Sequence, residues 1–595
     1  MAKERFVSDD LVQRLQDWGV HRVFGFSGDG INPILGAFNR AENPPEFFQV
    51  RHEETAALLA TAHAKYTGEV GVCLSTQGPG AVHMLNGLYD AKLDHQPVVA
   101  IVGQISGMSA GSHFQQEIDL STLFKDVASA FVEVASAPES VNQIIDRAFR
   151  TAISQRTVTC VIVPHDTQRK PAVEHPPVEH GAMHPAVGIA SKPRVVPEDA
   201  DLKRAADILN AGRKVAILVG AGALDATDEV IAVAERLGAG VAKALLGKAV
   251  VPDDLPYVTG SVGWLGTIAS NRMMTECDTL LMIGSTFPYT EFLPTPGQAR
   301  GIQIDLNAGM LGMRYPMEVN LVGGSAETLD ALLPMLDDQS VTSWRSTIEG
   351  YVREWDAEAG RRAQEPATPV NPIRYFTELS PRLPDNCILS ADSGTSTVWY
   401  ARHLKMRRGM MGSVSGTLAT MGCALPYALA AKVAYPDRVC FALLGDGAMQ
   451  MNGLNQLVTV AEQWRNWDDP RLIIFVIHNN DLAYVTWEQR AMEGDPQFAG
   501  SQQVPDFPYA DYANMLGLHG IRIDSPDQIG SMWDEALASD RPVVIDALAD
   551  PNVPTIPPEP TEQIREKIAS ALSREPDEAH VHTLLEQSGT ELPEG

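Results

Sequence analysis

The chain has 595 residues, too many for one hydrophobic core, and its length predicts about three domains. The formal net charge of -29 argues against a nucleic-acid partner and against binding to an anionic membrane surface. No apolar run approaches the length of a membrane span, and the first ten residues lack a signal-peptide core. We therefore expect a cytoplasmic protein without stable membrane insertion.

The six cysteines form no CxxC pair and show no regular spacing. Several stand inside apolar runs, which is typical of buried, reduced thiols. We expect no disulfide framework.

Short apolar runs typical of buried strands alternate with helical patterns along almost the whole chain. This alternation predicts repeated βαβ units and parallel sheets. The clearest runs are His21–Phe26, Val70–Ser75, Val98–Gly103, Thr159–Val163, Lys214–Val219, Thr279–Ile283 and Gly301–Ile304.

Two breaks divide this pattern. The stretch from Asp166 to Pro197 is rich in Pro and His and indicates an extended linker, and a polar break runs from about Asp337 to Pro372. We predict an α/β fold of three doubly wound parallel-sheet domains with a C-terminal tail. The expected ranges are 1–185, 190–340 and 370–550, with the tail at 551–595.

In the third predicted domain, two strands end in polar residues. Val439–Leu444 leads into Gly445-Asp446-Gly447-Ala448, and Leu472–Ile477 leads towards Asn479-Asn480. Parallel strands would bring this carboxylate and an amide to the same sheet edge, where they suit a hard divalent cation beside phosphate. The glycines allow close backbone approach. The sequence favours a pyrophosphate-bearing cofactor, although a lone Gly-Asp-Gly can also be a tight turn.

Two upstream segments strengthen this hypothesis. Ser393, Gly394 and Thr395 follow the apolar run Cys387–Ser390, so the hydroxyl groups could donate to phosphate. Further along, Thr420–Pro426 is a small-residue segment that holds one large apolar side chain, Met421.

These motifs resemble those of the thiamine diphosphate-dependent enzymes, and the resemblance extends over all three predicted domains. Within the family the likeness is greatest to pyruvate oxidase and quinone-dependent pyruvate dehydrogenase, followed by acetolactate synthase. In the first domain the matching segments are Gly25–Gly28, Arg51–Glu54, Gly78–His83 and Asn86–Asp90, with Pro97 and Gly103-Gln104.

By this resemblance, Glu53 hydrogen-bonds the pyrimidine ring of thiamine diphosphate and favours the tautomer whose imino group activates the thiazolium. Glu54 is the adjacent alternative, but the His-Glu order favours Glu53. Met421 becomes the wedge that bends the cofactor. The other residues that the resemblance places at this cofactor are Ser27, Gly28, Gly78, His83, Ser393, Gly394, Thr395, Thr420, Gly445, Gly447 and Ala448.

The same resemblance makes Asp446 a ligand of Mg²⁺, with two registers open for the remaining ligands. One takes the second asparagine, Asn480, and the carbonyl of Leu482. The other takes Asn479 and the carbonyl of Asp481. We prefer the second register, because short motifs tolerate such slips and the downstream residues then match better.

In the preferred register, Tyr484 is the aromatic side chain near thiazolium and flavin, and Glu488 is a family acidic position. Phe114 and Gln115 resemble the Phe-Gln pair that lines the substrate side of the pocket. Gln115 would donate to the developing oxyanion. We expect Glu53, Phe114, Gln115, Tyr484 and Glu488 to be the catalytic residues.

The central domain resembles the flavin-binding domain of pyruvate oxidase. The residues expected at flavin-adenine dinucleotide (FAD) are Gly247, Lys248, Gly263, Gly266 and Asp305, the last of these on an adenosine ribose hydroxyl. Related carboligases and decarboxylases keep this domain without flavin redox chemistry or without flavin, so that alternative stays open.

The sequence thus predicts oxidative decarboxylation of a 2-oxo acid, with pyruvate as expected substrate and electrons passing to FAD and then to quinone or oxygen. A carboligase of the acetolactate synthase type and a non-oxidative decarboxylase are the alternatives. A non-catalytic protein is disfavoured, because Glu53, Asp446 and Met421 are all present. Since family members place the glutamate and the metal site on different subunits, we expect a homodimer or homotetramer. The C-terminal stripe of Ile564, Ile568 and Leu572 should pack on the protein itself.

Overall fold

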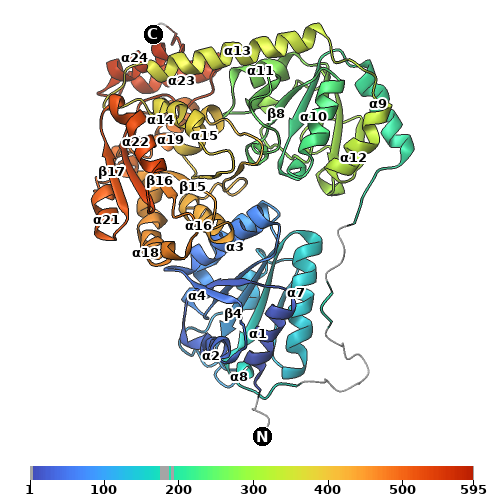
Figure 1. The fold of residues 1–595 in the computed structure, drawn as a ribbon, viewed down its shortest axis with the longest axis vertical. Helices are drawn as coiled ribbons and strands as arrows, with labels where there is room; N and C mark the ends of the chain where they lie inside the picture. Colours follow the sequence, from blue (N-terminus) through green and yellow to red (C-terminus); the bar gives the residue numbers. More distant parts are fainter. Residues whose placement is uncertain (1–4, 174–185, 189–192, 594–595) are drawn as a thin grey trace. The chain divides into compact units, whose positions relative to one another are not determined.

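The computed structural model describes residues 5–173, 186–188 and 193–593. These residues form an α/β fold with three six-stranded parallel sheets, each flanked by helices as predicted (Figure 1). The chain divides into two compact units. The first unit comprises Met1–Ser191, Ser415–Asp437 and Met451–Pro470, and the second comprises Lys192–Val414, Arg438–Gln450 and Arg471–Gly595.

The first sheet, in the first unit, has the strand order β2-β1-β3-β4-β6-β5. Its order reverses between β1 and β3, and ligands of doubly wound sheets bind at the carboxyl ends of the strands that flank such a reversal. The strands are β1 (Arg22–Gly25), β2 (Glu46–Gln49), β3 (Gly71–Ser75), β4 (Val98–Gln104), β5 (Val132–Val134) and β6 (Val158–Pro164). The helices of this unit are α1 (Val7–Asp17), α2 (Asn32–Arg40), α3 (Glu53–Thr67), α4 (Pro79–His83), α5 (Leu85–Leu93), α6 (Leu120–Phe124), α7 (Val141–Gln155), α8 (His165–Gln168), α16 (Ala424–Ala434) and α18 (Leu454–Gln463).

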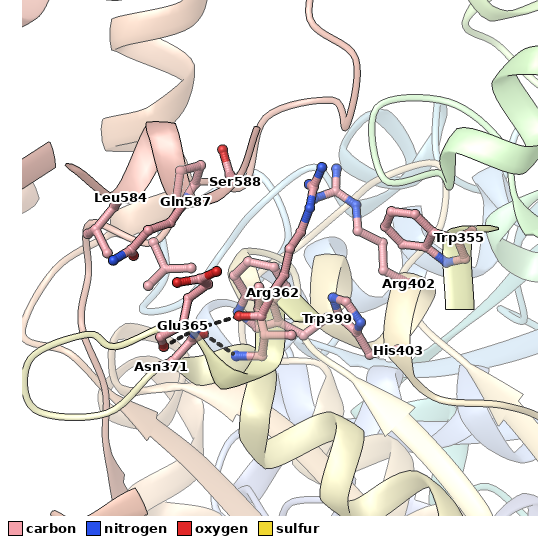
Figure 2. Close-up of a pocket in the computed structure, with 13 residues that line it drawn as sticks. Trp355, Arg362, Glu365, Asn371, Trp399, Arg402, His403, Leu584, Gln587 and Ser588 are labelled. Atoms are coloured by element: carbon pink, nitrogen blue, oxygen red, sulfur yellow. Dashed lines mark hydrogen bonds between the residues drawn. The ribbon is translucent and has the colours of Figure 1, made fainter. Parts of the chain in front are cut away.

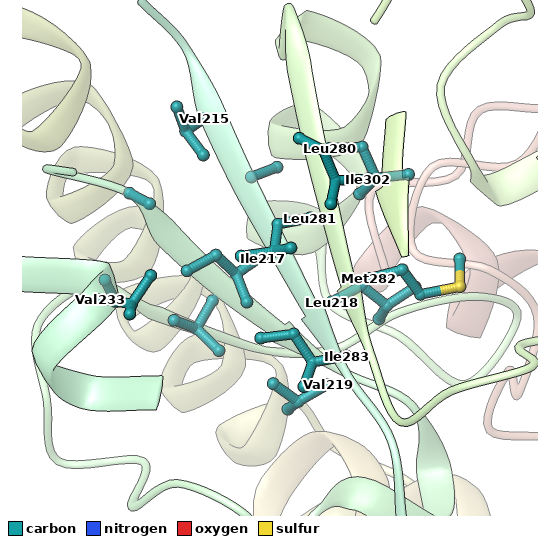
Figure 3. Close-up of a cluster of buried hydrophobic side chains, with 14 of the residues drawn as sticks. Val215, Ile217, Leu218, Val219, Val233, Leu280, Leu281, Met282, Ile283 and Ile302 are labelled. Carbon is teal, nitrogen blue, oxygen red and sulfur yellow. The ribbon is translucent and has the colours of Figure 1, made fainter. Parts of the chain in front are cut away.

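The second sheet has the order β12-β11-β10-β7-β8-β9, so its reversal lies between β7 and β10. Every side chain of these two strands is buried, because helices cover both faces (Figure 3). The strands are β7 (Val215–Val219), β8 (Gly240–Lys243), β9 (Val258–Ser261), β10 (Thr279–Ile283), β11 (Arg300–Asp305) and β12 (Val319–Val322). The accompanying helices are α9 (Asp199–Ala211), α10 (Thr227–Arg236), α11 (Ile268–Glu276) and α12 (Ser325–Leu332).

The third sheet repeats the topology of the first, with the order β14-β13-β15-β16-β18-β17 and a reversal between β13 and β15. Its strands are β13 (Ile388–Ala391), β14 (Met411–Ser413), β15 (Cys440–Gly445), β16 (Leu472–His478), β17 (His519–Ile523) and β18 (Val543–Leu548). The remaining helices of the second unit are α13 (Ser343–Gln364), α14 (Pro372–Leu379), α15 (Thr395–His403), α17 (Asp446–Ala448), α19 (Ala483–Glu488), α20 (Ala499–Gln502), α21 (Tyr509–Met515), α22 (Ile529–Leu537), α23 (Glu562–Leu572) and α24 (Glu578–Gln587).

The predicted polar break from Asp337 to Pro372 is largely a helix, which corrects the reading from the sequence. Helix α13 buries Trp344, Ile348 and Trp355 at helical spacing, while its other faces stay polar. Thr342 caps its N-terminus by accepting a hydrogen bond from the backbone amide of Arg345. The predicted linker holds α8 at its start, and residues 174–185 and 189–192 lie outside the described residues. The predicted domain boundaries stay predictions.

The C-terminal helices pack on the second unit, as expected. Ile568 and Leu572 of α23 are buried, and Ile564 packs partly against the same cluster as Trp487. All six cysteines are buried and stand outside any disulfide, as predicted. Among the described residues, no helix combines the length and apolar character that a bilayer crossing requires.

Candidate active site

The reversal point of the first sheet is lined by closely packed backbone. Gly28 follows β1, and a Cβ there would lie 2.5 Å from Cβ of Thr76, which follows β3. Gly78 has a φ of +61°, and a Cβ there would lie 2.7 Å from Cβ of Gln116. Ser27 precedes Gly28 in the same loop. Only glycine fits at these two positions, because the backbone packs closely against Thr76 and Gln116.

Glu53 is the first residue of α3 and is only 8% exposed. Its Oε2 lies 2.9 Å from Nδ1 of His83, and a Cβ on Gly80 would lie 3.2 Å from its Oε1. His52 caps the helix, because its Nδ1 accepts the amide of Glu54 at 3.3 Å. A carboxylate at a helix N-terminus is stabilised by the helix dipole, which helps to explain how this acidic group tolerates burial.

The neighbouring carboxylate of Glu54 has a structural role. Its Oε1 accepts from Nδ2 of Asn86 at 2.7 Å and from Nδ2 of Asn452 at 3.1 Å. Asn86 also donates to Oγ1 of Thr420 at 2.8 Å. Glu54 therefore ties α3 to two other segments of the first unit and leaves Glu53 as the carboxylate beside His83.

The loop that carries Met421 is held by buried acids of α5 and the residues just after it. Oγ of Ser415 donates to Asp90 at 2.7 Å, and two successive amides of the loop donate to Asp94 at 2.9 and 2.8 Å. Burial would raise the pKa of Asp94, but the Lys65 ammonium at 2.7 Å and these amides lower it instead. Met421 is partly exposed on this fixed loop.

At the reversal of the third sheet, Asp446 directly follows β15 and is 2% exposed. Its Oδ2 accepts the amides of Asn479 at 2.9 Å and Asn480 at 2.6 Å, and Oδ1 accepts the amide of Gly447 at 2.8 Å. Burial raises the pKa of Asp446 to about 6 despite these three bonds. A buried carboxylate whose partners are neutral amides is chemically suited to a divalent cation.

The two asparagines after β16 have different surroundings. Asn480 adopts a left-handed φ of +57°, and its Nδ2 lies 3.2 Å from Nε2 of His478 and donates to the carbonyl of Val504 at 3.3 Å. Oδ1 of Asn479 accepts the amide of Asp481 at 3.1 Å in a local turn. The side chain of Asn480 thus anchors a loop, while Asn479 stands beside Asp446.

Sequence reasoning missed His478, the last residue of β16. Its Nδ1 lies 2.6 Å from Oδ1 of Asp546, and its Nε2 lies 3.0 Å from Oδ1 of Asp506. Burial would lower the pKa of His478, but the hydrogen bond to Asp546 together with the negative charges of Asp546, Asp446 and Asp506 outweighs it, and the pKa is raised. Arg522 completes the group by donating to Asp546 at 2.8 Å. The sequence signal that could have found it is the position of His478 as a polar residue at the end of an otherwise apolar strand.

At the end of β13, Gly394 has a φ of +120° and α15 begins at Thr395. A Cβ on Gly394 or on Gly445 would meet no atom within 4 Å, so the space above both strand ends is open. Ser393 lies in this turn, and the free amides of a helix N-terminus favour an anion. The predicted phosphate-binding residues therefore gather at one edge of the third sheet.

Tyr484 and Glu488 lie one helical turn apart on α19, so they share a face of this helix. Burial raises the pKa of both groups. Glu488 also lines a surface pocket of about 380 Å³. The other lining residues are Val485, Gln489, Met492, Glu493 and Asp495.

Phe114 and Gln115 stand on an exposed loop between β4 and α6, where Phe114 is 55% exposed. The structure does not bring them into contact with Glu53. The next residue, Gln116, instead accepts from Nε2 of Gln77 at 2.9 Å and packs beside Gly78. Gln116 is thus the residue of this loop that reaches the reversal point of the first sheet.

Glycines also line the reversal of the central sheet. The amide of Gly220 donates to Ile283 at 3.0 Å, and that of Gly222 donates to Gly284 at 2.9 Å. A Cβ on Gly247 would lie 2.6 Å from the carbonyl oxygen of Val219. This close packing leaves the strand ends bare of side chains, as a dinucleotide requires.

Three of the other residues predicted at FAD lie near this edge or on its loops. Asp305 ends β11, and its Oδ1 accepts the amide of Asn307 at 2.8 Å. Gly263 has a φ of +97°, and its carbonyl accepts the amide of Gly266 at 2.8 Å.

The ammonium of Lys248, one of the residues predicted at FAD, points into the protein. Its Nζ donates to the carbonyl of Ala401 at 3.1 Å and lies 3.7 Å from Oδ2 of Asp253. The side chain is 2% exposed, and burial lowers its pKa to about 8. In this conformation the ammonium is not free to bind a cofactor phosphate.

A small cavity of about 30 Å³ in the second unit lies between α13, α15 and the C-terminal segment (Figure 2). The guanidinium groups of Arg362 and Arg402 lie side by side there, next to Trp355 (Figure 2). Arg402 donates to the carbonyls of Trp264 and Ile556, each at 2.7 Å. Burial lowers its pKa to about 9. The hydrogen bonds of Arg402 therefore tie α15 to the segments that hold Trp264 and Ile556.

Comparison with known families matches the chain in three parts. Residues 5–123 match the thiamine pyrophosphate enzyme N-terminal TPP-binding domain, residues 202–332 the central domain, and residues 392–547 the C-terminal TPP-binding domain.

Individual relatives cover nearly the whole chain. A Bacillus subtilis protein named as thiamine pyrophosphate-containing, YdaP, is 36% identical, with 92% of both chains covered. The pyruvate oxidase of Lactiplantibacillus plantarum is 28% identical over 93% of this chain and 90% of its own. The acetolactate synthase isozyme 2 large subunit of Escherichia coli is 30% identical over 92% of this chain and 97% of its own.

Proposed function

The chain belongs to the thiamine pyrophosphate enzyme family, and on that premise we propose that it oxidatively decarboxylates a 2-oxo acid. Pyruvate is the expected substrate. The observation that carries the proposal is the pair of Tyr484 and Glu488, one turn apart on α19, of which Glu488 lines a surface pocket. An aromatic side chain and a partly buried acid at this spacing match the arrangement expected of the oxidases.

The third sheet supplies the residues that would hold Mg²⁺ and the diphosphate. Asp446 and Asn479 offer side-chain oxygens, and Asp481 offers its carbonyl. We prefer this register over the one with Asn480 and Leu482 because the residues downstream then match the family better, while the backbone amides of both asparagines donate to Asp446. Gly445, Gly447 and Ala448 with Ser393, Gly394 and Thr395 would surround the phosphates, and Thr420 of the first unit is proposed as a further cofactor-binding residue.

Glu53 would hydrogen-bond the aminopyrimidine, with Ser27, Gly28, Gly78 and His83 around it. Thiamine diphosphate, when bound, supplies the electron sink for decarboxylation, and FAD supplies a two-electron acceptor. Glu53 holds the pyrimidine tautomer, Met421 shapes the cofactor's bend, and Gln115 and Glu488 orient the substrate. Phe114 forms an apolar wall, which requires its exposed loop to close over the site.

The glycine-lined reversal of the central sheet supports FAD binding. Gly220, Gly222 and Gly284 form a closely packed glycine turn at the ends of β7 and β10, and Asp305 would bind a ribose hydroxyl. Gly247, Gly263 and Gly266 would continue the surface along the flavin. Lys248 would contribute through its backbone, because its ammonium is buried.

An acetolactate synthase-type carboligase is the second candidate, because such a synthase is 30% identical over nearly the whole chain. The assay that separates the candidates supplies thiamine diphosphate, Mg²⁺, FAD and pyruvate, with and without an artificial electron acceptor. We expect carbon dioxide release that depends on the acceptor. Acetolactate formed without an acceptor would establish the carboligase, and free aldehyde would establish a non-oxidative decarboxylase.

We further propose a homodimer or homotetramer, since the family divides Glu53 and the metal site between subunits. Quinone and oxygen are the proposed acceptors, and a cytoplasmic location is proposed with them. Sedimentation at several protein concentrations tests the assembly.

A further inference from the structure

Two histidines and a glutamate gather at the N-terminus of α3. Nδ1 of His83 lies 2.9 Å from Oε2 of Glu53. The rings of His52 and His83 are stacked, with centroids 4.4 Å apart and an interplanar angle of 26°. One ligand atom from each of the three residues lies within 4.8 Å of the other two. The three side chains therefore lie close together, and sharing one ion would require an imidazole to rotate out of the stack.

This donor set differs from that of the magnesium site proposed on the third sheet. Two imidazoles and one carboxylate are typical ligands of Zn²⁺ and related transition metals, whereas Mg²⁺ takes oxygen ligands. Bonds of about 2.0–2.2 Å place tetrahedral ligand atoms roughly 3.3–3.5 Å apart. Metal binding would therefore draw together ligand atoms that now lie within 4.8 Å of one another. The side chain of His83 is 43% exposed and has room to rotate.

The surroundings leave the cluster open to a cation. The nearby guanidinium of Arg51 pairs with Glu462. The carboxylate of Glu54 is occupied by two asparagine amides. A Cβ on Gly80 would lie 3.2 Å from Oε1 of Glu53, so the glycine keeps a side chain from crowding that oxygen. The net charge of -29 also attracts cations to the protein.

We propose that His52, Glu53 and His83 bind a Zn²⁺-class cation when the aminopyrimidine of the cofactor is absent. The competitive part rests on the proposed function, because Glu53 cannot bind both a transition metal and the pyrimidine ring. When thiamine diphosphate is absent, this part of the cofactor site is thus a second metal site whose occupation inhibits the enzyme. Bound thiamine diphosphate excludes the metal from it.

Co²⁺ added to full-length protein freed of metal and cofactor tests the site, because its visible d–d absorption reports nitrogen ligands and low coordination. We expect an absorption band that saturates at one Co²⁺ per chain. Added Zn²⁺ should abolish this band by displacing Co²⁺. His83→Ala should weaken Co²⁺ binding at least about tenfold, since even outer-shell partners cost that much. His519→Ala is the matched control, because His519 pairs with Glu535 at 2.8 Å elsewhere on the protein and should leave the band unchanged.

His52→Asn is a second variant that keeps a capping side chain on α3 and removes the imidazole. Its circular dichroism should match that of the wild type, so that loss of the band reports loss of a ligand. An unchanged band in both folded His83→Ala and folded His52→Asn would overturn the metal site.

The competition arm adds thiamine diphosphate with Mg²⁺ to the Co²⁺-loaded protein and follows cofactor binding by tryptophan fluorescence. We expect the band to disappear as cofactor binds, whereas Mg²⁺ alone leaves it intact. A band that persists in cofactor-bound protein would refute competition at Glu53. Failure of thiamine diphosphate with Mg²⁺ to bind protein that holds no Co²⁺ would instead refute the proposed function, and the variants above would still decide the metal site.

Discussion

At the residue scale, the candidate active site contains two pairs of adjacent identical residues, and the two members of each pair make different contacts. Glu53 faces His83, whereas Glu54 accepts from Asn86 and Asn452. Asn479 stands beside Asp446, whereas the side chain of Asn480 anchors a loop. Each pair therefore offers a variant and its matched control.

Glu53→Gln should lower kcat by at least about a hundredfold, because an amide cannot supply the proton that the pyrimidine tautomer needs. Glu54→Gln keeps an oxygen that can accept from the two asparagines and should retain most of the activity. Steady-state kinetics with saturating cofactor checks both variants. Equal losses in the two variants would contradict the assignment of Glu53.

Asn479→Ala should raise the Mg²⁺ concentration needed for cofactor binding about 10–100-fold, because a metal ligand is lost. Asn480→Gly should change it little, since glycine adopts the φ of +57° readily. Fluorescence titration of thiamine diphosphate at varied Mg²⁺ measures the difference. A larger rise in the Mg²⁺ requirement for Asn480→Gly than for Asn479→Ala would instead favour Asn480 and the carbonyl of Leu482 as the metal ligands.

Lys248→Met should stabilise the protein near neutral pH. The pKa of Lys248 falls from 10.5 in the unfolded chain to about 8 when folded, so charging it at pH 7 costs on the order of 3 kcal/mol. Between those two pKa values the unfolded state binds the extra proton, so the wild type gains stability as the pH rises from about 8 to 10.5. Urea unfolding at pH 7 and pH 9.5 should show the variant's advantage shrinking. An advantage independent of pH would contradict this account.

At the element scale, α19 connects the active site to the C-terminal helices. One face carries Tyr484 and Glu488, and Trp487 on the same helix packs in the cluster with α23 and α24. The helix continues into a π-helical turn, Gln489–Glu493, whose Arg490 pairs with Glu575 at 2.7 Å. The C-terminal segment therefore supports the position of the proposed catalytic residues.

Glu575→Gln should destabilise the protein by about 3–5 kcal/mol, because it leaves the buried charge of Arg490 without its partner. Arg574→Ala is the control, since its pair with Asp495 is half exposed and should contribute about 0–1 kcal/mol. Thermal unfolding and proteolysis of the C-terminal helices measure the two variants. Comparable stability of both variants would show that the ion pair does not hold the segment.

The strand ends could be predicted from the sequence because buried parallel strands are continuous apolar runs followed by glycine. Asp446 and the other residues near the strand ends were found in this way. The helix α13 was not, because its buried residues are widely spaced among charged ones. The pair of His478 and Asp546 joins residues 68 positions apart, and no local pattern encodes such a contact. The inward turn of Lys248 depends on Asp253 and Ala401 and was equally hidden.

At the scale of the whole molecule, three parallel sheets each place chemistry at a reversal of strand order. The first sheet presents Gly28 and Gly78, the central sheet presents Gly220 and Gly284, and the third presents Asp446. The first and third sheets share one topology, while the central sheet has the order expected of a dinucleotide-binding domain. The account therefore assigns one function to each sheet: pyrimidine, flavin and diphosphate.

The most direct test of this account is the visible spectrum of the protein reconstituted with thiamine diphosphate, Mg²⁺ and FAD, recorded without oxygen while pyruvate is added. Because decarboxylation should deliver two electrons to the flavin, we predict that the flavin absorption bleaches in proportion to the pyruvate added and returns when oxygen or a quinone is admitted. A flavin that stays oxidised while pyruvate is converted to acetolactate would contradict the central claim.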